Sequence, residues 1–246
     1  MPKSASGRGG RSPRGGGQQG LKVKVRTAKR RKLSSTLWLK RQLNDPYVAA
    51  AKREGYRSRA AYKLAEIDAK YRFLKPGGVV VDLGAAPGGW SQVAAARVKA
   101  GEGAGIVLAM DIAEMDPIPG VTILLADFMD EKAPGALIAA LAGRRPDAVI
   151  SDMAAPATGH RRTDHLRIMG LCEAALDFAL GVLAPGGVFL CKVLQGGTGH
   201  ELLDAMKRDF AVVRHVKPKA SRADSAELYV LATGFRGKIS AGDQSR

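Results

Sequence analysis

The sequence predicts an α/β fold built on a doubly wound sheet with helices on both faces. Two observations carry this prediction. Short apolar runs typical of buried strands alternate with stretches of helical periodicity over most of the chain. Near the end, two strand-like runs follow one another without a helix between them, which predicts an antiparallel hairpin at one edge. In such sheets ligands bind beyond the carboxyl ends of the strands, so functional residues are expected there.

The first elements follow from apolar runs and the turn residues that flank them. A helix is expected to begin near Ser58, a suitable N-cap, with small and apolar side chains on one face. The sequence VVVDLG at 79–84 follows a Pro-Gly-Gly turn and ends in glycine, as a short buried strand does. Further along we expect a helix at 90–99 and strands at 105–111 and 121–127.

The second half of the chain repeats this alternation. Another Pro-Gly-Gly turn, at 185–187, again leads into a strand, and leucines recur at helical spacing before it. The expected strands are 147–152, 188–195, 211–216 and 226–235, and the expected helices are 134–142, 164–183 and 200–210.

The positive charge of the chain is concentrated at its N-terminus. The 246 residues include 39 Lys and Arg against 23 Asp and Glu, a formal net charge of +16. Residues 1–44 hold 13 of the basic residues and no acidic residue, which leaves 26 basic and 23 acidic residues, or +3, in 45–246. We therefore expect a basic, Gly-rich, disordered arm at 1–44 and a folded domain at 45–246. The arm is suited to neutralising RNA phosphates without reading sequence, and a solubilising leader is the alternative.

Composition also constrains the setting of the protein. Hydrophobic residues make up 46% of the chain, enough for a core. The basic N-terminus lacks the apolar stretch of a secretory signal, and the longest uncharged apolar stretch, 178–191, is too short to cross a membrane. Two cysteines cannot form a disulfide framework, and four scattered histidines lack metal-ligand spacing. We expect a cytoplasmic monomer that binds neither a membrane nor a metal.

A glycine turn follows the first expected strand. The sequence DLGAAPGGW, 82–90, opens a helix, and its glycines allow close backbone approach to a ligand and supply N–H groups at the helix start. Alanine stands where the G-x-G-x-x-G motif needs its second glycine, which counts against NAD and an oxidoreductase. An ordinary tight turn is the alternative. We expect Gly88 and Trp90 to take part in cofactor binding.

Aspartates close three successive expected strands. Asp111 ends the second strand and is placed to accept hydrogen bonds from ribose hydroxyls. Asp127 ends the third strand and is suited to an exocyclic amine of adenine, and Asp152 ends the fourth. A single aspartate at a strand end is as often a turn residue. Together, the three aspartates predict S-adenosylmethionine (SAM) as the cofactor.

Four motifs carry a resemblance to a known family. They are DLGAAPGGWSQ, SDMAAP, CKVLQG and SRADSAELYVLATG, which occur in family order between Arg57 and Gly234. They resemble the FtsJ/RrmJ-type ribosomal RNA 2′-O-methyltransferases, the large subunit methyltransferase E family. The resemblance implies a Rossmann-like, seven-stranded, mostly parallel sheet with an antiparallel last strand. It also implies transfer of a methyl group from SAM to the ribose 2′-hydroxyl of a uridine in 23S rRNA of the large ribosomal subunit.

The family uses a Lys-Asp-Lys-Glu tetrad, which the resemblance places at Lys63, Asp152, Lys192 and Glu227. Lys192 interrupts an apolar strand, where an unpaired ammonium is costly, although a strand-end lysine also reaches solvent in many proteins. Burial and neighbouring positive charge favour a neutral amine, so Lys192 is expected to be the general base. Asp152 and Lys63 would set its charge state and orient the hydroxyl. Glu227, interpreted as part of an edge strand, would hold this network; without the resemblance, Lys63 and Glu227 would be taken for solvated surface charges.

Basic residues flank two members of the tetrad, in KREGYRSR at 52–59 and KPKASR at 217–222. Charged stretches are usually solvated faces, but two of them beside one site favour a surface that follows RNA phosphates. Tyr56 and Tyr62 are candidates for stacking on a base, with a place in the core as the alternative. One loop departs from the family: after SDMA at 151–154, Ala-Pro-Ala stands where the family has Pro-Asn. This change concerns substrate positioning and not catalysis.

Two other functions share parts of this pattern. A transfer-RNA or mRNA-cap 2′-O-methyltransferase would use the same tetrad, although no separate domain for a cap pocket is visible in the sequence. A non-catalytic RNA-binding ribosome assembly factor would keep the fold but would not need all four tetrad residues. We therefore expect a SAM-dependent rRNA methyltransferase whose partner is the RNA of the large subunit.

Overall fold

The computed structural model describes residues 33–156, 158–195, 200–222 and 225–237. The chain divides into two compact units, Met1–Asp45 and Pro46–Arg246. In the first unit, Leu33–Leu43 forms helix α1, so the disorder predicted for 1–44 is wrong over this stretch. The larger part of the predicted arm, 1–32, lies outside the described residues.

Local composition explains why α1 forms. The glycines of the N-terminal stretch end at Gly20, and the sequence LSSTLWLKRQL contains neither glycine nor proline. Lys40 and Arg41 lie in its last turn, where the helix dipole favours positive charge. A high density of basic residues was therefore a poor guide to disorder at this end of the arm.

The second unit is built on a seven-stranded sheet with the order β3-β2-β1-β4-β5-β7-β6. Its strands are β1 (Val79–Leu83), β2 (Ile106–Asp111), β3 (Val121–Leu125), β4 (Ala148–Ser151), β5 (Val188–Leu194), β6 (Phe210–Val216) and β7 (Glu227–Phe235). Pairings among β1 to β5 are parallel, whereas β7 is antiparallel to both of its neighbours. The predicted α/β class, the mostly parallel sheet and the antiparallel hairpin at one edge are confirmed.

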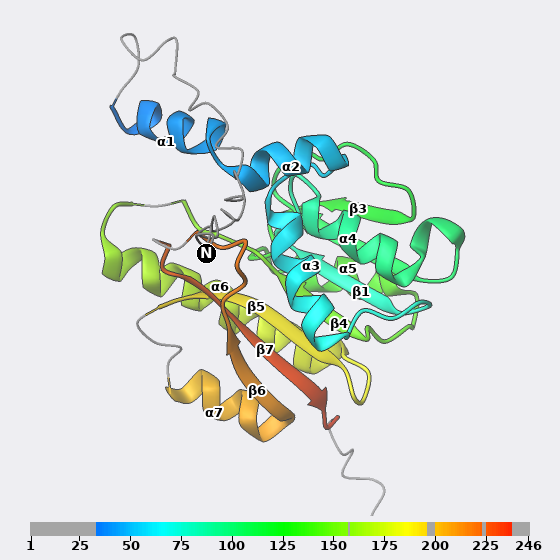
Figure 1. The fold of residues 1–246 in the computed structure, drawn as a ribbon. Helices are drawn as coiled ribbons and strands as arrows, with labels where there is room; N and C mark the ends of the chain where they lie inside the picture. The colour runs from blue at the N-terminus through cyan, green and yellow to red at the C-terminus, as the bar shows by residue number, and fades with distance from the viewer. Residues whose placement is uncertain (1–32, 157, 196–199, 223–224, 238–246) are drawn as a thin grey trace, which may run out of the picture. The chain divides into compact units, whose positions relative to one another are not determined.

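Strand β7 is not an edge strand, so the prediction that Glu227 lies in an edge strand is wrong. The edge is β6, and β7 lies between β5 and β6 (Figure 1). Helix α7 (His200–Asp209) connects β5 to β6, which does not pair with β5. Strand β7 then turns back from β6 and pairs with both β5 and β6. Because β7 runs opposite to β5, its first residue Glu227 pairs with Leu194 at the end of β5.

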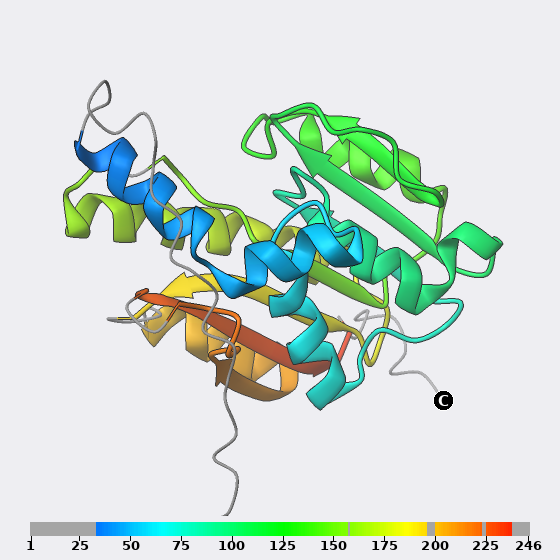
Figure 2. The same cartoon turned by 45° about the horizontal axis from the view of Figure 1, so that its top comes forward.

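Helices cover both faces of the sheet (Figures 1 and 2). One face carries α3 (Ala60–Tyr71) and α4 (Gly89–Val98), and the other carries α5 (Ala133–Leu141), α6 (Arg161–Val182) and α7. Alternation along β1 sends Val80 into the first core and Val79 and Val81 into the second. Helix α2 (Pro46–Glu54), which the sequence analysis did not predict, precedes α3. In the described part of the chain, no helix is both long and apolar enough to span a membrane.

The predicted elements of the folded domain all occur, and the differences lie at their ends. Helix α6 begins at Arg161, three residues before the predicted start at 164. Strand β3 ends at Leu125, so Asp127 lies in the following loop and not on the strand. Asp111 does end β2, and Asp152 directly follows β4.

Candidate active site

The four predicted catalytic residues come from four elements that meet at one edge of the sheet. Lys63 lies on α3, Asp152 follows β4, Lys192 lies near the end of β5, and Glu227 begins β7. Because β4 and β5 are parallel, their carboxyl ends lie side by side, and the antiparallel β7 brings its amino end to the same place. Residues as far apart in sequence as Lys63 and Glu227, 164 positions, are thereby in direct contact.

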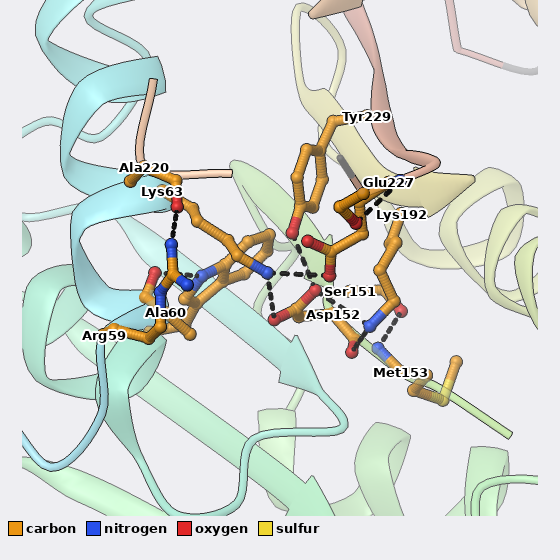
Figure 3. A network of polar contacts seen from close by, with 12 residues as sticks. Arg59, Ala60, Lys63, Ser151, Asp152, Met153, Lys192, Ala220, Glu227 and Tyr229 are labelled. Atoms are coloured by element: carbon orange, nitrogen blue, oxygen red, sulfur yellow. Dashed lines mark hydrogen bonds and ion pairs between the residues drawn. The ribbon is translucent and has the colours of Figure 1, made fainter. Parts of the chain in front are cut away.

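A chain of ion pairs joins the four side chains (Figure 3). Lys63 Nζ lies 2.8 Å from Glu227 Oε1 and 3.8 Å from Asp152 Oδ2. Lys192 Nζ lies 3.0 Å from Asp152 Oδ1 and donates a hydrogen bond of 2.5 Å to the main-chain oxygen of Asp152. Asp152 is therefore the centre of the cluster, with one lysine beside each carboxylate oxygen. Two ammonium groups face two carboxylates, so the formal charges cancel.

Burial strengthens these interactions. Lys63 and Lys192 are only 7% and 6% exposed, so water screens their charges weakly. Burial alone would raise the pKa of Asp152, but the charges of Lys192 and Lys63, with hydrogen bonds from Lys192 and Tyr229, lower it below its usual value. Asp152 therefore stays ionised near neutral pH and forms ion pairs with both lysines.

Tyr229 completes the cluster, although the sequence analysis did not single it out for a role. Its hydroxyl donates a 2.8 Å hydrogen bond to Asp152 Oδ1, and the residue is fully buried. Burial and the neighbouring carboxylates raise the pKa of Tyr229 well above its usual value, so the phenol keeps its proton and remains a donor. The available signal was strand alternation, which puts Tyr229 on the same face of β7 as Glu227.

Trp90 packs against Tyr229 of the cluster. Its indole N–H donates a 2.9 Å hydrogen bond to the Ala60 main-chain oxygen, and its ring centroid lies 5.6 Å from that of Tyr229. The residue is 2% exposed. Its side chain thus packs against the cluster through Tyr229, and the predicted part of Trp90 in cofactor binding remains a proposal.

A pocket of about 250 Å³ opens beside the cluster, and Asp152 borders both. Its other walls come from the glycine turn after β1 and from the loops that follow β2 and β3. These walls include Gly84, Ala86, Asp111, Ile112, Asp127 and Phe128. A larger hollow of about 680 Å³ lies at the opposite ends of the strands, between the two Pro-Gly-Gly turns, and contains none of the predicted site residues.

Two of the predicted cofactor residues shape the pocket as well as lining it. Asp111 accepts hydrogen bonds of 2.8 Å from the main-chain N–H groups of Ala86 and Ala113, so it fixes the glycine turn. Asp127 accepts a 2.9 Å hydrogen bond from the main-chain N–H of Met129, the contact of a turn-forming aspartate. Since a carboxylate has about four acceptor positions, both residues can still bind a ligand.

Two positions in the turn between β1 and α4 have a positive φ and are occupied by glycine. Gly84 has a φ of +74°, and a Cβ there would lie 2.6 Å from Met153 Cγ, so only glycine fits. Gly88 has a φ of +107° and is the N-cap of α4. It is not among the lining residues of the pocket, so its predicted part in cofactor binding remains a proposal.

A family model described as FtsJ-like methyltransferase matches residues 56–235, the span that holds the tetrad and the pocket. This chain belongs to the FtsJ-like methyltransferase family. The Ribosomal RNA large subunit methyltransferase E of Parvibaculum lavamentivorans is 65% identical over 239 residues, which cover 94% of each chain. The protein of the same name from Paramagnetospirillum magneticum is 61% identical over 237 residues, 96% of this chain and 97% of its own.

The FtsJ-like fold also agrees with a solved structure. A Plasmodium falciparum protein, assigned as a ribosomal RNA methyltransferase, is 31% identical and superposes with a TM-score of 0.66. The match covers 74% of this chain and 100% of the other. The seven-stranded sheet is therefore shared with a protein assigned as a methyltransferase.

Methyltransferases of the FtsJ-like family take their methyl group from SAM, and the pocket fits such a molecule. Asp111 and Asp127 offer acceptors for hydroxyl and amino groups, and Ile112 and Phe128 offer apolar surface. Ile112 is 71% exposed, and its position directly after Asp111 was a signal that the sequence analysis did not use. When bound, SAM supplies a methyl group that a positively charged sulfur has already activated.

Another carboxyl group, Asp82, lies within the sheet behind the glycine turn of the FtsJ-like domain. It belongs to β1, is fully buried, and accepts a 2.6 Å hydrogen bond from the Ser91 hydroxyl on Oδ2. Burial raises the pKa of Asp82 to about 7, the charges of Asp152 and Asp111 add to the rise, and the Ser91 hydrogen bond opposes it. Asp82 therefore carries a proton for part of the time near neutral pH.

The basic segment 52–59 divides into inward and outward residues. Arg57 donates to main-chain oxygens of the loop after β2, and Arg59 donates to the main-chain oxygen of Ala220. Lys52 and Arg53, in contrast, are exposed. The predicted phosphate-following surface therefore rests on fewer residues of this segment than its sequence suggested.

The two tyrosines of this region contact each other. The rings of Tyr56 and Tyr62 meet edge to face with centroids 5.4 Å apart, and the Tyr62 hydroxyl donates a 2.7 Å hydrogen bond to Glu54 Oε2. Both side chains are half-buried. Stacking of either ring on a base stays a prediction.

The loop that departs from the family pattern connects β4 to α6. Ala154 lines the pocket. Thr158, through its N–H and hydroxyl, and Gly159, through its N–H, donate to the carboxylate of Asp164 in the first turn of α6. The far side of the loop is thus anchored to the helix, and the effect of Ala155 on substrate positioning stays a prediction.

Proposed function

We propose that this protein transfers a methyl group from SAM to the ribose 2′-hydroxyl of a uridine in 23S rRNA of the large ribosomal subunit. The names of the relatives support the large-subunit RNA as substrate, since they are 61% and 65% identical over almost the whole chain. The observation that carries the chemistry is the position of Asp152, which lines the pocket and also holds both lysines of the tetrad.

A ribose 2′-hydroxyl is a poor nucleophile near neutral pH and must lose its proton as it attacks. We assign Lys192 Nζ as the group that takes this proton, which requires that the resting ammonium of Lys192 first releases its own proton to solvent. The ammonium that results already has two acceptors, Asp152 Oδ1 at 3.0 Å and the Asp152 main-chain oxygen at 2.5 Å. Asp152 thus stabilises the charged product of proton transfer and orients the amine beforehand.

Lys63 has a different task. Its Nζ is held at 2.8 Å by Glu227 and at 3.8 Å by Asp152, and a cation in this position stabilises negative charge that develops on the attacking oxygen. Glu227 fixes Lys63, and Tyr229 fixes Asp152 through its 2.8 Å hydrogen bond. Because Lys63, Lys192 and Tyr229 are buried, water does not compete strongly for the hydroxyl proton.

The RNA approaches this edge of the sheet on a basic surface. Exposed Lys52 and Arg53 flank α3 on one side, and exposed Lys217 and Lys219 lie in the loop before β7. Such contacts to phosphates position the RNA without specifying its sequence. We further propose that the protein acts as a cytoplasmic monomer, that residues 1–44 add a further RNA contact, and that 45–246 form the catalytic domain.

The proposal is tested with purified protein and labelled SAM on three substrates: large ribosomal subunits, naked 23S rRNA and transfer RNA. We expect label on a ribose of 23S rRNA, which nucleotide mapping would locate at a uridine. Lys192→Ala should abolish transfer while SAM binding persists, since Lys192 is not among the pocket-lining residues. An active Lys192→Ala variant would remove this lysine as the base.

Other outcomes separate the alternative functions. Label in transfer RNA alone would replace the proposal by a transfer-RNA 2′-O-methyltransferase, and label in a base would exclude ribose chemistry. SAM binding without transfer to any of the three RNAs, together with tight binding to the large subunit, would favour a non-catalytic assembly factor.

A further inference from the structure

Arg57 connects three separate segments near the cofactor pocket. It lies between α2 and α3, and its side chain is half-buried. Nη1 donates hydrogen bonds to the main-chain oxygens of Asp116, at 2.6 Å, and Pro87, at 3.3 Å. Nη2 donates a 2.8 Å hydrogen bond to the main-chain oxygen of Pro117. A single guanidinium therefore links the segment before α3, the glycine turn and the loop after β2.

The loops that Arg57 joins are two walls of the pocket. The glycine turn contributes Gly84 and Ala86 to the lining, and the loop after β2 begins with the lining residue Ile112. In both loops, the residues that Arg57 contacts belong to neither a helix nor a strand. The carbonyl oxygens of this stretch depend on side-chain donors or water, and a forked guanidinium can reach several of them at once.

Packing and main-chain contacts hold Arg57 in place. A Cβ on Gly88 would lie 3.0 Å from Arg57 Nη1 and 3.2 Å from its Cδ, so the side chain lies directly against this glycine. The Arg57 main-chain N–H donates a 2.8 Å hydrogen bond to Gln92 Oε1 on α4, and Gln92 Nε2 donates to the Gly55 main-chain oxygen at 3.0 Å. The segment is thus tied to α4 at Gly55 and at Arg57 itself.

We propose that Arg57 is a positioning residue for SAM, which holds the two loops in the arrangement that forms the pocket. It does this through main-chain oxygens and not by neutralising RNA phosphate, although its sequence context, KREGYRSR, suggests phosphate binding. The same segment leads into α3, so Arg57 also fixes the distance between the pocket and the helix that carries Lys63. The inference rests on the family's methyl donor and not on the identity of the RNA.

Equilibrium binding of SAM to the full-length protein, measured by calorimetry without RNA, tests the proposal. Arg57→Ala removes all three hydrogen bonds of the guanidinium and should weaken SAM binding by about tenfold, because only part of their stabilisation is coupled to the pocket. Arg57→Lys should recover only a small part of this loss, because one ammonium cannot reach all three carbonyl oxygens. The control Arg53→Ala removes a positive charge from the exposed part of the same segment and should leave SAM binding unchanged.

Two further readouts separate positioning from other roles. In steady-state assays, Arg57→Ala should raise KM for SAM about tenfold and leave kcat at saturating SAM within about twofold. Hydrogen exchange should quicken at the amides of 84–88 and 112–119 and stay at the wild-type rate in the strands. Should Arg57→Ala fail to fold, Gln92→Ala loosens the same segment from α4 and should produce a smaller change in the same direction.

The proposal is overturned if SAM binds equally well to Arg57→Ala and the wild type. It is also overturned if KM rises for the RNA and not for SAM, or if Arg57→Lys restores full function, since both results indicate a phosphate contact. Because the calorimetric arm contains no RNA, it can succeed even if the 23S rRNA substrate proposed above is wrong.

Discussion

Replacing Tyr229 by phenylalanine isolates one hydrogen bond at the centre of the tetrad. The change removes the hydroxyl that donates to Asp152 Oδ1 at 2.8 Å and keeps the ring that packs against Trp90 and Lys63. A hydrogen bond to a charged group contributes about 1.5–3 kcal/mol to stability. Asp152 keeps both lysines in the variant, so we expect a loss near the lower limit, about 1.5 kcal/mol.

This loss is measurable as a lower melting temperature. For a domain of this size, 1 kcal/mol corresponds to about 2–4 °C, so Tyr229→Phe should melt about 3–6 °C below the wild type at neutral pH. Activity should fall by about three- to tenfold, because Asp152 is less well oriented but remains paired with Lys192. Tyr71→Phe applies the same change at the far end of α3, outside the cluster, and serves as the control.

The pH dependence provides a second check with a defined sign. The pKa of Asp152 is lowered in the folded protein, so its contribution to stability is present above the unfolded pKa and is lost as pH falls through the folded pKa. The Tyr229 hydrogen bond contributes to that lowering, so its removal moves the folded pKa of Asp152 upward. The difference in melting temperature between Tyr229→Phe and the wild type should therefore become smaller as the pH falls below about 4.

An unchanged melting temperature together with unchanged activity would refute this reasoning, because it would mean that the hydroxyl does not stabilise the Asp152 carboxylate. A complete loss of activity at unchanged stability would refute it differently. That result would show that Tyr229 acts on the substrate and not through Asp152.

Three other predictions follow from single features. The pKa of Asp82 is raised from 3.8 to about 7 in the folded protein, so ionisation of Asp82 destabilises the fold as pH rises between these values. The free energy of unfolding of the wild type should therefore fall by up to about 4 kcal/mol relative to that of Asp82→Asn. Melting temperatures of the two proteins that stay parallel across pH 4–8 would contradict this. Glu66 accepts a 3.1 Å hydrogen bond from the Ala220 main-chain N–H in the basic loop before β7. Glu66→Ala removes this contact and should raise KM for the RNA severalfold, whereas KM for SAM should stay unchanged and serves as the control. Residues 1–32 hold most of the excess positive charge, so deleting them should weaken RNA binding and make it less dependent on salt concentration. If the truncated and full-length proteins bound RNA with the same affinity over a salt series, this stretch would be a leader without a role in binding.

Much of the fold was predictable because local pattern and tertiary position agree in it. The two Pro-Gly-Gly turns each lead into a buried strand, and VVVDLG is apolar because helices cover both faces of β1. The catalytic residues were predictable only through motifs of the family. Lys63 and Glu227 look like surface charges in the sequence, but in the fold they are in contact across 164 positions, with Lys63 buried and Glu227 partly buried.

Three of the errors have a common physical cause, which is that neighbours in space were not visible in the sequence. Glu227 was placed on an edge strand because nothing in the order of strands shows that β7 returns between β5 and β6. Arg57 and Arg59 were counted with the phosphate-binding charges, although the carbonyl oxygens that occupy them lie in distant loops. Tyr229 was passed over because its partner, Asp152, is 77 positions away.

The sequence by itself determined the class of the sheet, the separation of a basic N-terminal stretch from a nearly neutral domain, and the chemical groups available for methyl transfer. These properties depend on composition, periodicity and local motifs, which short stretches of chain contain in full. The tertiary structure alone decided which of the charged residues face each other. The antiparallel insertion of β7 beside β5 brings Glu227 and Tyr229 to the carboxyl ends of the parallel strands, where Lys63, Asp152 and Lys192 already lie. In that buried place two ammonium and two carboxylate groups cancel one another's charge, and so a costly set of buried ions becomes a stable site.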